Sequence, residues 1–251
     1  MEHAVCPGSC FCAIEISLYL KVLLRLMTME NEIDVRQALE EARLAVKGLP
    51  RTGDGDTIEA YWELCCGDVL VAEDNLREQR RYWENSALAE EFLDVAGYLE
   101  GFDHKLDDLN QAVQRMVDAV YEHPALKLRL LGFRLLVLRR IGSLHGCELS
   151  AAEDVESQMT MYERNIRYAD SGEYDRVEQE GFLKHDPVEW STAYEKVIDE
   201  VERLVEEQLD DHPRGMGFCF AYWSAKEHVL LTKFGIEWRS PSVMNPGVHF
   251  D

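Results

Sequence analysis

Basic side chains are scarce in this sequence. Its 251 residues include 26 Lys and Arg against 48 Asp and Glu, which gives a formal net charge of −22. A charge of this sign repels nucleic acids and anionic lipid head groups over distances that salt does not screen. Direct binding of nucleic acid is therefore not expected, and a protein partner is expected to be basic.

Long hydrophobic runs and strand patterns are also missing. The most apolar stretch, residues 13–27, is shorter than the roughly 20 residues that a membrane-spanning helix needs. It is also interrupted by Glu15, Lys21 and Arg25. No stretch alternates between apolar and polar residues for long enough to predict a strand. The sequence therefore predicts an all-α protein without a membrane span.

The cysteines do not form a disulfide framework. There are seven, an odd number, and Cys65 and Cys66 are neighbours on an expected helix. Such an arrangement is a poor basis for paired disulfides. We expect a reducing, cytoplasmic location, with Cys65, Cys66 and Cys219 acting as small buried apolar side chains.

Potential metal ligands gather in one place, near the N-terminus, at His3, Cys6, Cys10 and Cys12. Structural zinc sites usually combine donors from two separated pairs, which this group lacks. We therefore predict no metal and no cofactor. Residues 1–28 are interpreted as a first amphipathic helix or as an extension ahead of a working start at Met27 or Met29.

Local signatures of catalysis are absent. The eight histidines do not fall in the Glu-x-x-His or His-Glu-x-x-His patterns that place two metal ligands on one helical face. The sequence also has no Gly-x-x-x-x-Gly-Lys loop, no Gly-x-Gly-x-x-Gly turn and no Gly-x-Ser-x-Gly elbow. No catalytic residue is predicted, although an enzyme built from distant residues stays an open alternative.

Helical periodicity and its stop signals run through the rest of the chain. Apolar residues recur at helical spacing, and Gly48, Gly101, Gly146 and Gly235 follow the ends of such patterns. Expected N-cap residues are Thr57, either Asn85 or Ser86, and Ser150 in a capping box with Glu153. The expected helices cover about residues 30–47, 57–84, 85–100, 103–120, 124–144, 151–169, 187–204 and 217–234.

Seven or eight helices with short connections predict a bundle of antiparallel neighbours. The dipeptide Tyr-Trp recurs at positions 61, 82 and 222 without a constant spacing, so the bundle is expected to be non-repeating. Pro241 and Pro246 predict an extended C-terminal tail. Residues 29–251 are interpreted as a single helical domain with a soft boundary near residues 171–181, where helical patterns break.

Residues 123–147 are the basic exception in an acidic chain, because they contain no Asp or Glu. At 100° per residue their cations do not share one face, which disfavours a basic docking surface. We expect a central helix whose charged ends reach acidic neighbours. The cations are Lys127, Arg129, Arg134, Arg139 and Arg140.

Residues 186–211 show the opposite bias, with ten carboxylates against Lys196 and Arg203. An apolar seam at Trp190, Tyr194, Val197, Val201 and Leu204 predicts a helix that packs along a neighbour. Carboxylates off this seam predict an outward anionic surface. The residues expected to contact a partner there are Glu195, Asp199, Glu202, Glu206 and Asp210.

This surface carries the leading functional interpretation, a non-catalytic protein–protein interaction module. One alternative is a DNA mimic, because carboxylates on rigid helices can imitate the phosphates of a duplex. A second alternative is an enzyme or ligand-binding domain with an aromatic pocket near the last helix. The residues expected to line that pocket are Tyr222, Trp223, Lys226, His228, Trp238 and Arg239.

Two further expectations concern this last helix. Its N-terminus at Gly217 would favour a negatively charged group of a bound ligand. The competing interpretation is that the C-terminal tail folds back and its aromatic side chains close the hydrophobic core.

Overall fold

Helices account for all the regular structure in the described part of this chain. The computed structural model describes residues 34–250, so the interpretations of residues 1–28 lie outside the described residues. The structure is 71% helical, with about eight helices of seven or more residues and no strand among the described residues. The predicted all-α class is confirmed.

The long helices follow one another with short connections. They are α2 (Val35–Val46), α3 (Gly55–Glu78), α4 (Glu84–Leu99), α5 (Leu106–Ala119), α6 (Pro124–His145), α7 (Ser150–Asp170), α9 (Ile198–Gln208) and α10 (Phe218–Val229). Between and after them come the short turns η1 (Asp103–Lys105), η2 (Tyr174–Arg176), η3 (Pro187–Trp190), α8 (Thr192–Glu195), η4 (Leu230–Phe234) and α11 (Pro241–Met244).

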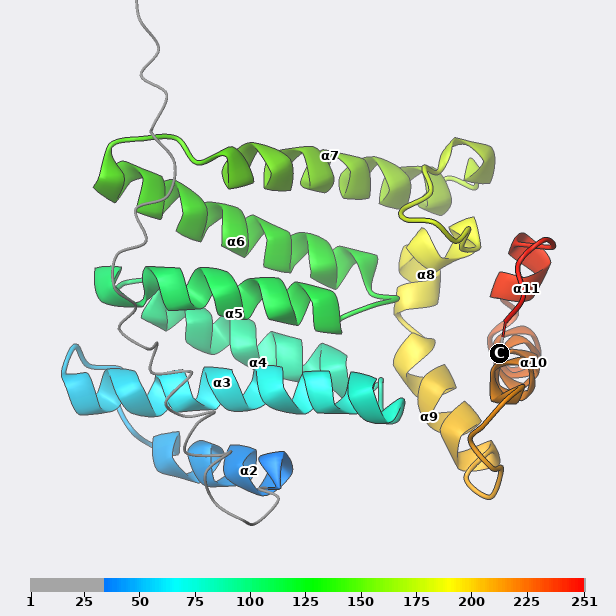
Figure 1. The fold of residues 1–251 in the computed structure, drawn as a ribbon, viewed down its shortest axis with the longest axis horizontal. Helices are drawn as coiled ribbons and strands as arrows, with labels where there is room; N and C mark the ends of the chain where they lie inside the picture. The colour runs from blue at the N-terminus through cyan, green and yellow to red at the C-terminus, as the bar shows by residue number, and fades with distance from the viewer. Residues whose placement is uncertain (1–33, 251) are drawn as a thin grey trace, which may run out of the picture.

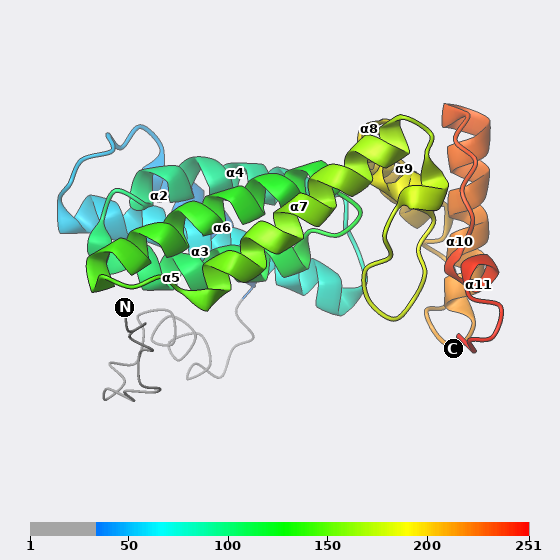
Figure 2. The same cartoon turned by 90° about the horizontal axis from the view of Figure 1, so that it is seen from above.

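The helices form a bundle with a C-terminal cap. Helices α3, α5, α6 and α7 lie roughly side by side, while α8 and α9 run across one end of the bundle (Figure 1). Helices α10 and α11 lie beyond α9 at the same end, so the molecule is elongated (Figure 2). The bundle end and the C-terminal helices therefore meet at one junction.

Buried apolar residues form two clusters. The larger is built from α2 to α7, with Trp62, Phe92 and Leu130 inside it, and it reaches as far as Val177 and Trp190. The smaller lies between α8, α9, α10 and the tail. The bundle core thus extends past residues 171–181, where the sequence suggested a soft boundary. The division into domains stays a prediction.

Several predicted helix ends are confirmed. Pro124 opens α6, where its missing N–H is no loss, and Gly146 ends this helix in the left-handed conformation that glycine favours. Gly235 does the same after the π-helical turn η4. These helix ends could be predicted from the sequence, because proline and glycine have distinctive backbone preferences.

The predicted N-caps are wrong in detail. Asp54, rather than Thr57, caps α3 by accepting a hydrogen bond from the Thr57 amide. Asn85 is buried inside α4 and donates to the carbonyl oxygens of Ala72 and Ala119, where it ties α4 to α3 and α5. Ser150 starts α7 without a side-chain cap.

The expected continuous helix over residues 187–204 is also wrong. The chain forms η3, α8 and α9 instead, because Ser191 caps a new helix and the helix breaks at Val197. Because of this break, α9 presents a different set of side chains to the core than a continuous helix would. Ile198, Val201 and Val205 are the fully buried positions of α9, in place of the predicted Val197 and Leu204.

Three of the five cations of α6 reach acidic neighbours as expected, whereas Arg134 bonds Asn110 and Lys127 forms no ion pair among the described residues. Arg129, Arg139 and Arg140 pair with carboxylates of α4, α7 and the α4–α5 connection. Cys65 and Cys66 are buried, as predicted, whereas Cys219 is only partly buried. Among residues 34–250, no helix is both long enough and apolar enough to cross a membrane.

One core residue is polar and poorly compensated. Asp68 of α3 is fully buried, and neither of its carboxylate oxygens has a hydrogen-bond partner. The guanidinium of Arg43 lies 3.9 Å away and bonds Glu91 instead. Burial, followed by the charge of Glu91, raises the pKa of Asp68 to about 9. The carboxyl group is therefore protonated at neutral pH.

We expect Asp68→Asn to stabilise the protein at neutral pH. An unfolded Asp68 ionises at its ordinary pKa of 3.8, whereas the folded one ionises near 9. Between these values each pH unit lowers the free energy of unfolding by at most about 1.4 kcal/mol. Urea unfolding should show a gain on the order of 3 kcal/mol at pH 7 that vanishes below about pH 4.

Asp107→Asn is the matched control for this substitution, because Asp107 is exposed on α5. It should change the free energy of unfolding little at any pH. A gain for Asp68→Asn that is the same at pH 4 and pH 8 would contradict a protonated Asp68.

Candidate functional site

The junction between the bundle and the C-terminal helices holds a buried ionic network. Its first member is Glu122, in the connection between α5 and α6. This residue has a left-handed backbone with φ 62°, which is uncommon for a residue with a Cβ atom. Its carboxylate accepts hydrogen bonds from Lys226 Nζ at 2.6 and 2.7 Å and from the Tyr194 hydroxyl at 3.0 Å.

Lys226 of α10 is the centre of the network and is only 2% exposed. Its ammonium also donates to Glu202 Oε1 at 2.8 Å and lies 5.2 Å from the centre of the Trp238 ring. Burial lowers the pKa of Lys226, but the charges of Glu122 and Glu202 outweigh it, so the pKa is raised. The side chain is a permanent cation in the core.

Glu202 of α9 completes this group and is almost fully buried. Its carboxylate accepts from Lys226 and from the Tyr222 hydroxyl. Burial raises the pKa of Glu202 and the neighbouring ammonium opposes that shift. One cation is thus shared by two carboxylates that come from α9 and from the end of the bundle.

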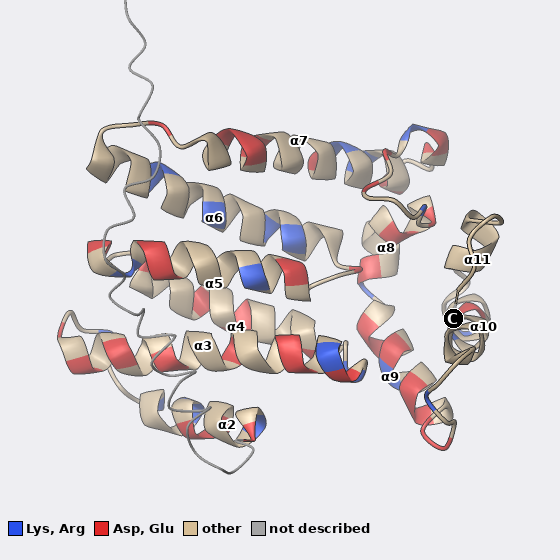
Figure 3. Cartoon of the chain, in the orientation of Figure 1, with Lys and Arg blue, Asp and Glu red and all other residues tan. Residues whose placement is uncertain are grey.

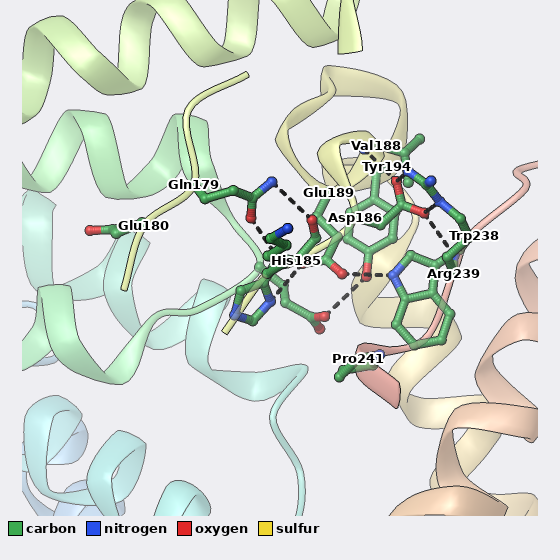
Figure 4. A network of polar contacts seen from close by, with 12 residues as sticks. Gln179, Glu180, His185, Asp186, Val188, Glu189, Tyr194, Trp238, Arg239 and Pro241 are labelled. Atoms are coloured by element: carbon green, nitrogen blue, oxygen red, sulfur yellow. Dashed lines mark hydrogen bonds and ion pairs between the residues drawn. The ribbon is translucent and has the colours of Figure 1, made fainter. Parts of the chain in front are cut away.

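A second polar group adjoins the first (Figure 4). Glu189 of η3 accepts from the indole N–H of Trp238 at 2.7 Å and lies 3.2 Å from Nδ1 of His185. The hydrogen bond to Glu189 raises the pKa of His185 against the effect of burial. Asp186, the N-cap of η3, pairs with the guanidinium of Arg239 at 2.9 Å.

A cavity of about 220 Å³ opens beside these two groups. It lies between the start of α6, the middle of α7 and the segment that leads into η3. Three aromatic rings form part of its wall, and the Tyr162 and Trp190 rings meet edge to face at 4.7 Å. The lining residues are Tyr121, Glu122, His123, Pro124, Lys127, Tyr162, Gln179, Glu180, His185, Glu189 and Trp190. We call it the junction cavity.

Most charged groups in the wall of the junction cavity already have partners. Glu122 and Glu189 are engaged as described, and Glu180 accepts from the Tyr162 hydroxyl at 2.7 Å. His123 Nε2 lies 2.9 Å from a carboxylate oxygen of Asp199.

Lys127 is the exception in this wall. Within the part of the chain that the structure describes it makes no hydrogen bond or ion pair, and its ammonium lies 6.0 Å from the Tyr162 ring. Burial lowers its pKa, and the charges of Glu180 and Asp118 do not offset that shift. The junction cavity therefore contains one cation with no carboxylate at ion-pair distance, and Glu180 of the same wall is the carboxylate whose charge acts on it most.

The six residues predicted to line a ligand pocket do not share one pocket. Tyr222, Lys226 and Trp238 do meet, but in the ionic network, where Lys226 is buried. Trp238 also lines a separate cavity together with Arg239. Trp223 packs against Phe250 at 5.0 Å, away from that network. The remaining two, His228 and Arg239, are exposed. The ligand-binding role of these residues stays a prediction.

Four of the five carboxylates expected on the outward anionic surface make hydrogen bonds within the molecule, and Glu202 is the one of them that is buried. Glu195 accepts from the amides of Ala125 and Leu126 at the start of α6. The other two are partly exposed: Asp199 accepts from the Ser86 hydroxyl at 2.6 Å, and Glu206 accepts from the Arg81 amide at 2.7 Å.

Asp210 alone of the five is exposed. Acidic positions occur on α9 and also on the other long helices except α6 (Figure 3). The role of the five carboxylates in binding a partner stays a prediction.

Sequence reasoning missed Glu122, His185 and Glu189, because all three lie outside regular α-helices, where periodicity gives no signal. Lys127 was noticed only as one of several cations on α6. Among residues 34–250, no three His, Cys, Asp or Glu side chains are placed to hold a metal ion. The group formed by His3, Cys6, Cys10 and Cys12 lies outside the described residues.

Comparison of the chain with known protein families, with curated proteins and with solved structures finds no match. The function of the chain must therefore be argued from the chemistry of the junction itself.

We expect Lys226→Met to destabilise the protein by about 3–5 kcal/mol, because it leaves two buried carboxylates without their cation. Urea unfolding at pH 7 measures the loss. It should shrink as the pH is lowered, since protonation removes the uncompensated charge. Adding Glu202→Gln to Lys226→Met should recover part of the stability.

Lys233→Met tests a lysine of the same helical segment whose ion pair with Glu200 is half exposed. Its cost should stay below about 1 kcal/mol. Equal losses for the two lysine variants would show that the buried network does not hold the junction together.

Proposed function

We propose that this protein is a helical ligand-binding protein that holds a small organic anion in the junction cavity. The observation that carries the proposal is Lys127, a partly buried ammonium in the cavity wall with no carboxylate at ion-pair distance. Burying a charge is costly unless it is paired. A bound carboxylate would provide the missing partner through a charge-assisted hydrogen bond.

The rest of the wall is compatible with an anion. Glu122 faces the ammonium of Lys226, and Glu189 faces His185, so both carboxylates are locally compensated. The third carboxylate of the wall, Glu180, accepts a hydrogen bond from the Tyr162 hydroxyl and leaves Lys127 as its nearest source of positive charge in the wall. The raised pKa of His185 increases the fraction of imidazolium at neutral pH. Two cationic groups, Lys127 and His185, thus support an anionic ligand.

Size and lining narrow the class of ligand. A volume of about 220 Å³ is below the range of about 300–1,000 Å³ that drug-sized ligands occupy. The rings of Tyr121, Tyr162 and Trp190 suit an apolar, planar group. A single aromatic ring that carries one carboxylate meets both demands.

The two surface hypotheses have less support than the cavity. An interaction module that uses residues 186–211, or a DNA mimic on the same helices, depends on free carboxylates. Glu195, Asp199, Glu202 and Glu206 are instead engaged within the molecule. Both hypotheses remain proposals that rest on Asp210 and other exposed acids.

Benzoate is the first probe of this function. We expect ligand-detected NMR to show binding at pH 6.5 that weakens as the pH rises through the raised pKa of His185. Loss of the ammonium in Lys127→Gln should weaken binding roughly tenfold or more, as expected for a hydrogen bond to a charged group. Neutral benzamide should bind more weakly than benzoate to the unchanged protein.

Lys196→Gln is the matched control for this experiment, because Lys196 is an exposed lysine on the adjacent segment. It should bind benzoate as the unchanged protein does. Absence of benzoate binding, or equal binding by Lys127→Gln and the unchanged protein, would reject the proposal.

A further inference from the structure

We propose that Lys127 is a reactive amine that forms an imine with a small aldehyde or ketone held in the junction cavity. The inference rests on the proposed function, because the same cavity would bind the carbonyl compound. It adds a covalent reaction and a substrate class to simple binding.

The position of Lys127 makes its amine available. Its side chain lines the junction cavity, and no carboxylate of the described residues pairs with it. A nucleophilic lysine needs an unprotonated nitrogen, and desolvation without a counter-ion is one way in which proteins produce it. Burial does lower the pKa of Lys127.

The other described lysines lack this combination. Lys226 is more deeply buried, but two carboxylates hold it as a cation and raise its pKa. Lys105 and Lys233 pair with Glu59 and Glu200. The remaining three are Lys47, Lys184 and Lys196, which are exposed. Selective reaction at Lys127 is thus expected from position as well as from charge.

The reaction balances without any further reagent. The neutral amine adds to the carbonyl carbon, and the nitrogen proton moves to oxygen to give a carbinolamine. Loss of the hydroxyl group as water, with one added proton, leaves a protonated imine. The positive charge of Lys127 is then kept on the imine nitrogen.

His185 is suited to supply the proton that the departing hydroxyl needs. It lines the junction cavity, and Glu189 occupies its Nδ1, which leaves Nε2 without a partner among the described residues. Its raised pKa favours the protonated imidazolium near neutral pH. We assign it the role of general acid in imine formation.

The test uses the full chain with benzaldehyde and sodium cyanoborohydride, which reduces an imine to a stable secondary amine. Peptide mass spectrometry then locates the benzyl group. We expect Lys127 to be modified roughly tenfold faster than Lys184 or Lys196, because the junction cavity holds the aldehyde beside its amine and the lowered pKa leaves more of that amine unprotonated. The rate should saturate with aldehyde, and benzoate should compete.

Two variants separate binding from reaction. Lys127→Arg keeps a cation in the junction cavity but removes the nucleophile, so it should bind benzoate while labelling at position 127 is lost. His185→Gln should keep Lys127 and slow labelling by roughly tenfold even at saturating aldehyde, where weaker binding no longer limits the rate, since it removes the proton donor.

The outcomes distinguish the two proposals. Labelling spread evenly over exposed lysines, with benzoate binding intact, overturns the imine and leaves the binding function standing. Failure of both benzoate binding and selective labelling overturns both. Selective, saturable labelling that benzoate blocks and that depends on His185 supports the reactive amine.

Discussion

The ammonium of Lys226 between Glu122 and Glu202 is the interaction on which the junction depends. It links three parts of the chain that are far apart in sequence: the end of the bundle, α9 and α10. A buried ion pair adds little stability by itself, because desolvation offsets much of the attraction. The network instead favours one arrangement of these helices, since an arrangement that buried the same groups apart would leave two carboxylates or one ammonium without a partner.

The position of the junction cavity follows from this network. Lys226 and Tyr194 hold the carboxylate of Glu122, and with it the left-handed backbone that turns the chain from α5 into α6. Pro124 starts α6 immediately afterwards, so the orientation of its first turn, which carries Lys127, is set by that connection. The unpaired ammonium is thereby directed at a cavity rather than at an acidic neighbour, unlike the arginines further along α6.

The sequence predicts the elements of this fold better than their assembly. Periodicity and the stop signals at Gly146 and Gly235 are local, so they locate α6 and α10 correctly. The helix break at Val197 could not be located in this way. The residues of α9 that become buried depend on which side of α9 packs against α10, and that is a property of the assembled fold. Glu122 and Lys226 are 104 positions apart, and no spacing rule connects residues at that distance. The junction therefore became visible only in three dimensions.

Composition alone was a poor guide to where the carboxylates of residues 186–211 lie. They were expected to face water, since that is where most carboxylates lie. In this chain several of them bind this segment to the bundle, because the bundle end offers groups that need an acceptor, whereas Glu207, Asp210 and Asp211 are exposed. Glu195 accepts from the first free amides of α6, where a negative charge also complements the helix dipole. Glu206 accepts from the left-handed Arg81. An acidic segment that lies next to unpaired amides at helix N-termini can therefore serve to pack against its own protein, and need not indicate an external partner.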